Sequence, residues 1–321
     1  MEREIKTKIN CPICSGKDSN KISSSLRRGE GKVYYCEKCN HGFLVDYTIN
    51  NYKEYYSKNY RQKVSHKSSA AATSPREIYE VYKNFQQDRL THVQPYLALN
   101  KNLLEIGASA GQFLCHIKNQ VNKVFAVELD ESCCRYLTSE FGIEADSNFL
   151  ENSRFTNHKF DIVCAFQVME HTEKPIEFLK VMRQYVKKGG TIFVEVPNIN
   201  DPLISVWNNQ AYQKFFYHSD HLHYFSEISL LKIIKDAGFQ ESQIEFYYTQ
   251  DYNLLNHLNW IMNEQPQEDC ILGLSEINLF GVNKDVSTWL SEEMRMLNKK
   301  YIDKLINLKC TSNILLKITC E

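Results

Sequence analysis

Four cysteines in two pairs carry the clearest metal-binding pattern in the sequence. Cys11 and Cys14 form one CxxC pair, and Cys36 and Cys39 form a second, with 21 residues between the pairs. Structural zinc favours four thiolates in a tetrahedron, and two tight turns that each present a thiolate pair supply this arrangement. A segment this short has too little apolar core to fold without the metal. The spacing predicts a zinc ribbon in residues 1–48, with structural Zn²⁺ bound by all four cysteines.

The full cysteine count indicates a reduced protein. The chain has 11 cysteines, an odd number spread along its length, which does not resemble a disulfide framework. The first six residues carry four charges, where a secretory leader would need an apolar run. No apolar run approaches the roughly 20 residues that span a bilayer. We therefore expect a cytoplasmic protein with no membrane insertion.

A strand, an acidic residue and a glycine turn follow one another at residues 104–111. The segment reads Leu-Glu-Ile-Gly-Ala-Ser-Ala-Gly, and its glycines allow the backbone to pass close to a bound nucleoside. Glu128 ends the next predicted strand, 17 residues after Gly111, and its carboxylate can accept hydrogen bonds from ribose hydroxyls. A dinucleotide-binding turn would read GxGxxG, and this turn does not. Glu105, the turn at Gly107 and Glu128 together predict a nucleoside-containing cofactor.

Three histidines lie within six residues and could accept protons. Histidine titrates near neutral pH, so His218, His221 and His223 are candidate general bases. In an extended stretch His221 and His223 share one face, and Asp220 points away from it. His171, which follows a predicted strand, is a further candidate. For any single histidine the alternative is a hydrogen-bonded packing or surface residue.

The elements that must position these residues follow an alternating pattern. Short buried strands are predicted at residues 103–106, 124–128, 160–166 and 191–196. Helical patterns lie between them, around residues 111–120, 131–141 and 175–186. Strands separated by helices of this length predict βαβ units and a mainly parallel sheet. Ser226 is a plausible N-cap for a helix that ends at Gly238, before the strand-like residues 244–248.

Composition changes along the chain predict four regions. These are a zinc ribbon (1–48), a linker with a lead-in helix (49–100), the main α/β domain (101–250) and a C-terminal helical extension (251–321). The linker is rich in tyrosine, which could stack on a sugar or pack against the core. Its tyrosines are Tyr52, Tyr55, Tyr56 and Tyr60.

The charge is unevenly distributed although the chain is almost neutral overall. Net charge is −1, but residues 1–67 hold 14 Lys and Arg against 7 Asp and Glu. A basic N-terminal region could contact phosphates of a nucleotide sugar, a lipid or RNA, or could be a solvated surface. No basic stripe interleaved with aromatic residues is present, so nucleic acid is not the expected partner.

The residues around the glycine turn resemble class I S-adenosylmethionine-dependent methyltransferases. Residues 160–171 and 187–194 extend this similarity, which covers about residues 76–250. The resemblance implies a Rossmann-like, doubly wound α/β sheet in which Asp146 lies near the adenine and Gln167 near the methionine end. Ser109 stands where the family has a middle glycine. The implied cofactor-binding residues are Glu105, Gly107, Ala108, Gly111, Glu128, Asp146 and Gln167.

The order of motifs also resembles bacterial methyltransferases that carry a zinc ribbon and modify sugars or surface polysaccharides. Sugar C-methyltransferases of this type have a Tyr-His-Glu-His segment, which Asp220 and His221 match in part. The resemblance implies His221 as general base, with Asp220 beside it and His223 or His171 as alternatives. We expect O-methylation of a small-molecule or sugar-linked substrate. Sugar C-methylation, or RNA methylation with the ribbon as RNA anchor, are the alternatives, and the sequence does not indicate an oligomeric state.

Overall fold

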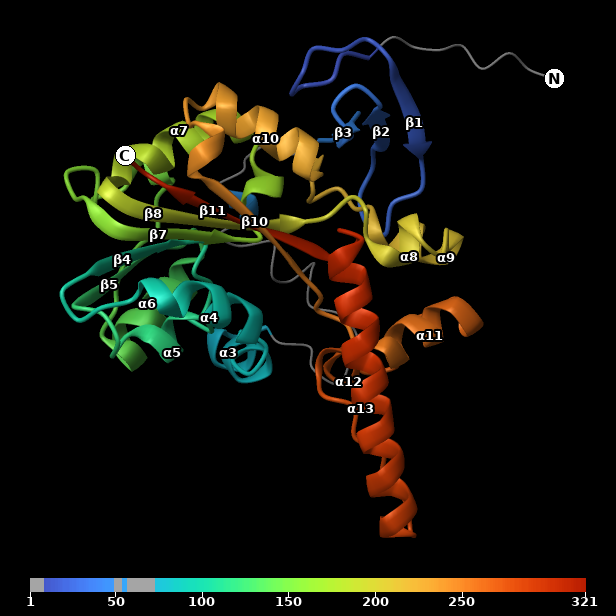
Figure 1. The fold of residues 1–321 in the computed structure, drawn as a ribbon. Helices are drawn as coiled ribbons and strands as arrows, with labels where there is room; N and C mark the ends of the chain where they lie inside the picture. Colours follow the sequence, from blue (N-terminus) through green and yellow to red (C-terminus); the bar gives the residue numbers. More distant parts are fainter. Residues whose placement is uncertain (1–8, 49–53, 57–72) are drawn as a thin grey trace.

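A seven-stranded sheet forms the centre of the protein. The computed structural model describes residues 9–48, 54–56 and 73–321, and its central strands are ordered β10-β11-β8-β7-β4-β5-β6 (Figure 1). The strands are β4 (Asn102–Ile106), β5 (Lys123–Val127), β6 (Glu144–Asp146), β7 (Phe160–Phe166), β8 (Val186–Pro197), β10 (Ile244–Thr249) and β11 (Asn313–Thr319). Strands β4 to β8 pair in parallel, and β11 is antiparallel to both neighbours. The predicted Rossmann-like α/β fold is confirmed.

Helices cover both faces of this sheet because its strands are apolar on both sides. In β4, Leu104 and Ile106 join one core cluster and Leu103 joins the other, as the alternation of a strand requires. One face carries α3 (Pro75–Tyr82), α4 (Gln87–Val93), α5 (Leu114–Ile117) and α6 (Glu131–Phe141), and the other carries α7 (Pro175–Tyr185) and α10 (Glu227–Asp236) (Figure 1). Short 3₁₀ turns lie at η2 (Gln94–Tyr96), η3 (Leu150–Asn152), η4 (Met169–His171) and η5 (Glu241–Gln243).

Local sequence signals explain where several of these helices begin and end. Ser226 is the N-cap of α10, and its hydroxyl accepts a hydrogen bond from the Ser229 amide. The lead-in segment holds two helices instead of one, and between them the side chain of Gln86 donates to the Tyr82 carbonyl. The helix expected at residues 111–120 is confined to α5.

The N-terminal ribbon is joined to the main domain by a shared sheet. Strands β1 (Ser19–Ser23), β2 (Lys32–Cys36) and β3 (His41–Val45) form an antiparallel sheet whose fourth strand is β9 (His223–Tyr224). Ribbon residues such as Phe43 also belong to the same core cluster as Phe225. The sequence suggests a module of its own, whereas β9 places the predicted histidine segment directly against the ribbon.

The sequence-based boundary at residue 250 does not mark the end of the sheet. Residues 313–319 form β11, which lies between β8 and β10 and is almost entirely buried. The predicted helical extension 251–321 is therefore corrected, since its last strand completes the main domain. The helical part contains α11 (Leu254–Asn263), α12 (Cys270–Leu274) and α13 (Lys284–Asn307), while α8 (Pro202–Ser205) and α9 (Gln210–Phe216) precede β9.

Helix α13 projects away from the rest of the molecule (Figure 1). It is the longest described helix at 24 residues and has only Ser291 and Leu305 fully buried. None of the helices in the described ranges combines the length and apolar character needed to cross a bilayer.

Because β11 lies inside the sheet, substitutions in it should destabilise the whole domain. Leu316 has none of its surface exposed, and we expect Leu316→Ala to lower the free energy of unfolding by about 2–5 kcal/mol. Leu99, which is 75% exposed, provides a matched control, and Leu99→Ala should change stability by about 0.5 kcal/mol or less. Urea unfolding followed by circular dichroism measures both. Equal effects of the two substitutions would contradict the placement of β11.

Candidate active site

A cavity of about 910 Å³ lies beyond the carboxyl ends of the parallel strands β4, β5 and β7. This edge is where open α/β sheets bind ligands, and the volume is in the usual range for small-molecule sites. Most of the predicted cofactor-binding residues line the cavity: Glu105, Gly107, Ala108, Glu128 and Gln167. The structure therefore brings together residues that the sequence separates by up to about 60 positions.

The turn after β4 depends on its glycines for two different reasons. Gly107 has a φ of 71°, and a Cβ there would lie 2.4 Å from Cγ2 of Val168. Ser109 has a φ of 50°, a left-handed conformation that costs a non-glycine residue about 1 kcal/mol or more. Gly111 does not line the cavity and instead faces α6. A Cβ at this position would lie 2.6 Å from Cδ2 of Leu137. Gly111 thus permits close helix packing instead of contacting a ligand.

Glu128 connects the glycine turn to the end of β5. One carboxylate oxygen accepts a hydrogen bond from the Ser109 amide at 2.6 Å, and the other accepts one from the Asp130 amide at 2.9 Å. The side chain is nearly buried but still lines the cavity. A carboxylate held in this way has a fixed orientation towards any ligand above the turn.

A partly buried ion pair lies at the base of the cavity, where Arg89 is one of the lining residues. Arg89 of α4 donates to Oε1 of Glu195 in β8 from two nitrogens, at 3.0 Å and 2.5 Å. Nearby, Oε2 of Glu105 is buried without a hydrogen-bond partner in the described residues. Burial raises the pKa of Glu105 to about 8, although Arg89 opposes this shift. Two carboxyl groups thus lie beside one cation, and a positively charged ligand would favour ionisation of Glu105.

The residues around this ion pair also connect distant segments of the chain. Gln167, predicted at the methionine end, has a φ of 56° and donates through Nε2 to Glu195 and to Asn313 of β11, both at 3.1 Å. Asn313 in turn donates to Asp251 at 2.8 Å, and burial raises the pKa of Asp251 to about 6.

Asp146, which we expected near an adenine, does not line the cavity. Its carboxylate accepts hydrogen bonds from Nδ2 of Asn148 at 2.9 Å and from the Arg154 amide at 2.5 Å. These bonds turn the carboxylate into the loop that follows β6. Asn148 and Phe149 of the same loop line the cavity in its place.

His171 is the one histidine of the four candidates that lines the cavity. Its Nδ1–H donates to the Asp220 carbonyl at 2.6 Å, so the neutral ring carries its lone pair on Nε2. Burial lowers the pKa of His171, which keeps the ring neutral at pH 7. Its Nε2 lies 3.7 Å from Oε1 of the fully buried Glu170. The arrangement holds a neutral imidazole at the cavity wall with its tautomer fixed.

His221, our leading sequence-based candidate, lies behind His171 and not on the cavity wall. The two rings meet edge to face at 4.8 Å, and Nε2 of His221 lies 3.8 Å from the same Glu170 oxygen. Both oxygens of Glu170 lack a hydrogen-bond partner in the described part of the chain, and burial raises the pKa of Glu170 to about 8. Glu170, His171 and His221 thus form one compact buried cluster.

Asp220 and His223 serve packing between the ribbon and the main domain. The Asp220 carboxylate accepts a hydrogen bond from Tyr55 and lies 3.3 Å from Arg28 of the ribbon, so it does not orient His221. His223 lies in β9, where its Nδ1 is 3.0 Å from Nε2 of His41 in β3, and both rings are buried. His223 is therefore corrected from a candidate base to an interface residue.

Part of the tyrosine-rich linker lines the cavity. Tyr56 lines it and packs edge to face on His171, with ring centroids 5.6 Å apart. Tyr52 and Tyr60 lie outside the described residues.

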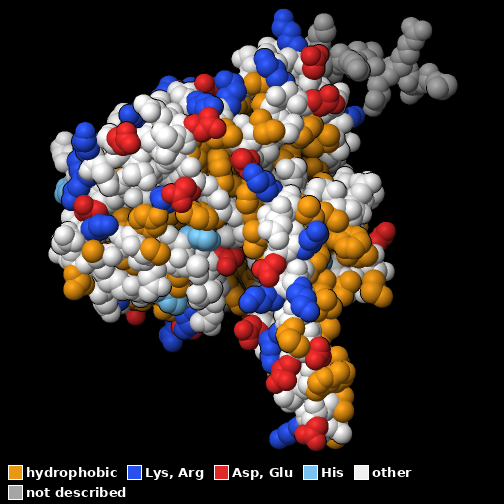
Figure 2. Space-filling view, viewed as in Figure 1, with side chains coloured by type: hydrophobic (Ala, Val, Ile, Leu, Met, Phe, Trp, Pro, Cys, Tyr) orange, Lys and Arg blue, Asp and Glu red, His pale blue; other side chains and the backbone are white. Residues whose placement is uncertain are grey.

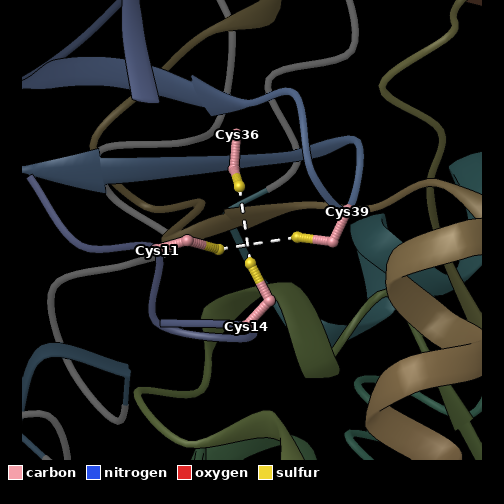
Figure 3. A group of neighbouring side chains, drawn as sticks. All are labelled: Cys11, Cys14, Cys36 and Cys39. Atoms are coloured by element: carbon pink, nitrogen blue, oxygen red, sulfur yellow. Dashed lines mark hydrogen bonds between the residues drawn. The ribbon is translucent and has the colours of Figure 1, made fainter. Parts of the chain in front are cut away.

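The four ribbon cysteines converge on a common point (Figure 3). The Sγ atoms of Cys11 and Cys39 are 3.6 Å apart, and those of Cys14 and Cys36 are 3.5 Å apart. A zinc ion with Zn–S bonds near 2.3 Å places tetrahedral thiolates about 3.8 Å apart, so the four sulfurs fit this metal.

Sequence reasoning missed Arg89, Glu195, Asp251 and Glu170. One signal was available, because Glu195 is an acidic residue inside a predicted apolar strand and so required a buried partner. The partner, Arg89, lies 106 positions earlier, and nothing local identifies it.

Comparison with known proteins agrees with this geometry. A family model described as "Methyltransferase domain" matches residues 79–243, about half of the chain. A tRNA U34 carboxymethyltransferase of Campylobacter jejuni is 29% identical over 105 residues, which are 32% of this chain and 35% of that protein. The mitochondrial ubiquinone biosynthesis O-methyltransferase of Dictyostelium discoideum is 37% identical over 57 residues, or 16% and 18% of the two chains.

Among solved structures, a SAM-dependent methyltransferase from Archaeoglobus fulgidus aligns with a TM-score of 0.47 at 16% identity, covering 74% of this chain and 94% of that one. The matches to the curated tRNA-modifying relatives span about a third of their length. The family match covers strands β4 to β8, the glycine turn and most of the residues that line the cavity. The chain belongs to the methyltransferase-domain family.

Proposed function

We propose that this enzyme methylates a hydroxyl group of a small, polar acceptor of the sugar, nucleotide-sugar or polysaccharide-linked class. The observation that carries the proposal is His171, a neutral imidazole with a fixed tautomer on the wall of the cofactor cavity. A hydroxyl must lose its proton as it attacks carbon, and a neutral imidazole is suited to accept it.

The cavity residues fit S-adenosylmethionine. Glu128 would accept hydrogen bonds from the ribose hydroxyls. The cofactor would lie against the turn at Gly107 and Ala108, in space that a side chain at position 107 would occupy. Glu105, with a buried oxygen that has no partner among the described residues, would face the positively charged methionine end with Gln167. Asn148 and Phe149 would take the adenine side that we first assigned to Asp146.

When bound, S-adenosylmethionine supplies a methyl group on a sulfonium, which is already a strong electrophile. The protein's own task is to align the acceptor and take its proton. His171 Nε2 would receive the proton, and Glu170, 3.7 Å from this nitrogen, would help to position the ring. Glu170 and His221 act here as positioning residues behind the base.

The acceptor class rests on the resemblance to ribbon-bearing sugar methyltransferases and on Tyr56 beside His171. The relative named as an O-methyltransferase supports transfer to oxygen over transfer to carbon. A second candidate is RNA, because the longest curated matches are tRNA U34 carboxymethyltransferases and the ribbon is basic.

Labelled S-adenosylmethionine separates the two acceptor classes. We expect label to enter members of a panel of nucleotide sugars and free glycosides. Label in total cellular RNA that is lost after nuclease treatment, with none in the sugar panel, would favour RNA and contradict the sugar proposal.

Glu128 should control cofactor affinity. Glu128→Gln removes the charged acceptor of the ribose hydroxyls, a loss of about 1.5–3 kcal/mol, and so should weaken S-adenosylmethionine binding at least tenfold in calorimetry. Glu131→Gln is the control, because Glu131 is exposed in the first turn of α6. Unchanged affinity in the Glu128 variant would remove this residue from the cofactor site.

His171 should be the general base. His171→Ala should lower turnover about 10²–10⁴-fold while leaving cofactor binding almost unchanged. Because burial lowers the pKa of His171, the wild-type rate should fall only as the pH drops below about 6.5, the ordinary histidine value, and the variant should lose this limb. His221→Ala, which removes a ring behind the base, should have the smaller effect. The reverse order would return the role to His221, as the sequence first suggested.

We also propose that Cys11, Cys14, Cys36 and Cys39 bind one structural zinc ion per chain. Because the ribbon shares a core and a sheet with the main domain, metal loss should destabilise more than the ribbon.

Elemental analysis of Cys36→Ser should show no stoichiometric zinc, and its thermal unfolding should begin at a clearly lower temperature than in the wild type. Cys115→Ser serves as the control, because Cys115 lies outside the cluster. A wild-type protein that holds no zinc after purification without chelators would rule out the site.

A further inference from the structure

Helix α13 has two faces with different roles. Its inner face is fixed to the body: Ser291 is buried and accepts a hydrogen bond from the Leu279 amide at 2.8 Å, and Asn298 accepts one from the Leu254 amide at 2.7 Å. Leu305 completes this face and is 2% exposed. Their spacing of seven residues places them on one side of the helix.

The opposite face carries large apolar residues that the described chain does not cover. Val286, Trp289, Met296 and Leu297 are each 50–59% exposed. Figure 2 shows apolar side chains along one side of the projecting helix. Helical spacing puts these residues in one row, and three charged residues lie in the same row. We name this row the outer stripe: Val286, Trp289, Leu290, Glu293, Met296, Leu297, Lys300 and Lys304.

The charges of the outer stripe are segregated along the helix. Glu293 lies on one side of Met296 and Leu297, and Lys300 lies on the other. Seven residues separate the two charges, about 10 Å along the axis, so they cannot bond to each other within one helix. Glu293 has no basic residue three or four positions away in the helix, whereas Lys300 has Asp303 three positions further on.

We propose that α13 of a second copy of this chain packs antiparallel on the outer stripe, about a two-fold axis at Met296 and Leu297. In this register Glu293 faces Lys300 of the second copy, and the symmetry makes the same pair twice. Trp289 faces Lys304 of the second copy, an arrangement that favours a cation–π contact. A parallel pair would instead place Glu293 against Glu293 and Lys300 against Lys300, which is unfavourable.

The length of the stripe sets the expected strength of the dimer. Helix α13 has 24 residues and is about 36 Å long, and one helix pair buries less surface than a standard protein interface. The dissociation constant should therefore be on the order of micromolar, and sedimentation equilibrium over a wide range of protein concentration can measure it.

Charge exchange tests the register. Glu293→Lys and Lys300→Glu should each raise the dissociation constant about tenfold, because each turns two attractions into two repulsions. The double variant carrying both changes should return to within about threefold of wild type. Glu292→Lys makes the same change in charge on an exposed residue outside the stripe and should have little effect. Thermal unfolding checks that every variant keeps its fold.

Three results would overturn the proposal. The first is a wild-type protein that stays monomeric up to hundreds of micromolar. The second is a double variant that does not recover, and the third is a Glu292→Lys variant as weak as Glu293→Lys. A monomer would leave the stripe to a different partner. Because the stripe lies outside the cofactor cavity, methyl transfer can be measured separately in the same variants.

Discussion

The ion pair between Arg89 and Glu195 is the contact on which the active-site cavity depends. Arg89 comes from a helix before the sheet, and Glu195 from its strand β8. Gln167 donates hydrogen bonds to Glu195 and to Asn313, so the loop after β7 and the last strand, β11, are both linked to this ion pair. Asn313 then holds Asp251. Removing either partner of the ion pair would leave a buried charge without compensation, a cost of about 3–5 kcal/mol.

Where the sequence carried local signals, it predicted the structure well. The strand and turn at residues 103–111 follow from an apolar run and two glycines, and they form β4 and the cavity turn as expected. Ser226 likewise marks the start of α10 by its own chemistry, as expected. Glu128 was identifiable because a carboxylate at the end of the second strand always lies near the first turn in this topology.

The errors share a physical cause, which is contact between residues far apart in the chain. Strand β11 pairs with strands that precede it by about 70 and 120 positions, and no local pattern at residues 313–319 identifies these distant partners. Which of His171 and His221 reaches the cavity depends on a backbone turn that places the His221 ring behind the His171 ring, edge to face. The link between His223 and His41 arises from pairing of β9 with β3, across 182 positions.

The buried acidic residues of the cavity would interact favourably with a cationic cofactor. Burial raises the pKa of Glu105 to about 8 and so keeps this side chain close to neutral. A sulfonium and an ammonium group nearby would favour the carboxylate form, so binding and loss of a proton are linked. The same positive charge would keep His171 neutral by opposing its protonation. In the proposed reaction, one set of charges would thus bind the cofactor and keep His171 in the neutral form that a base requires.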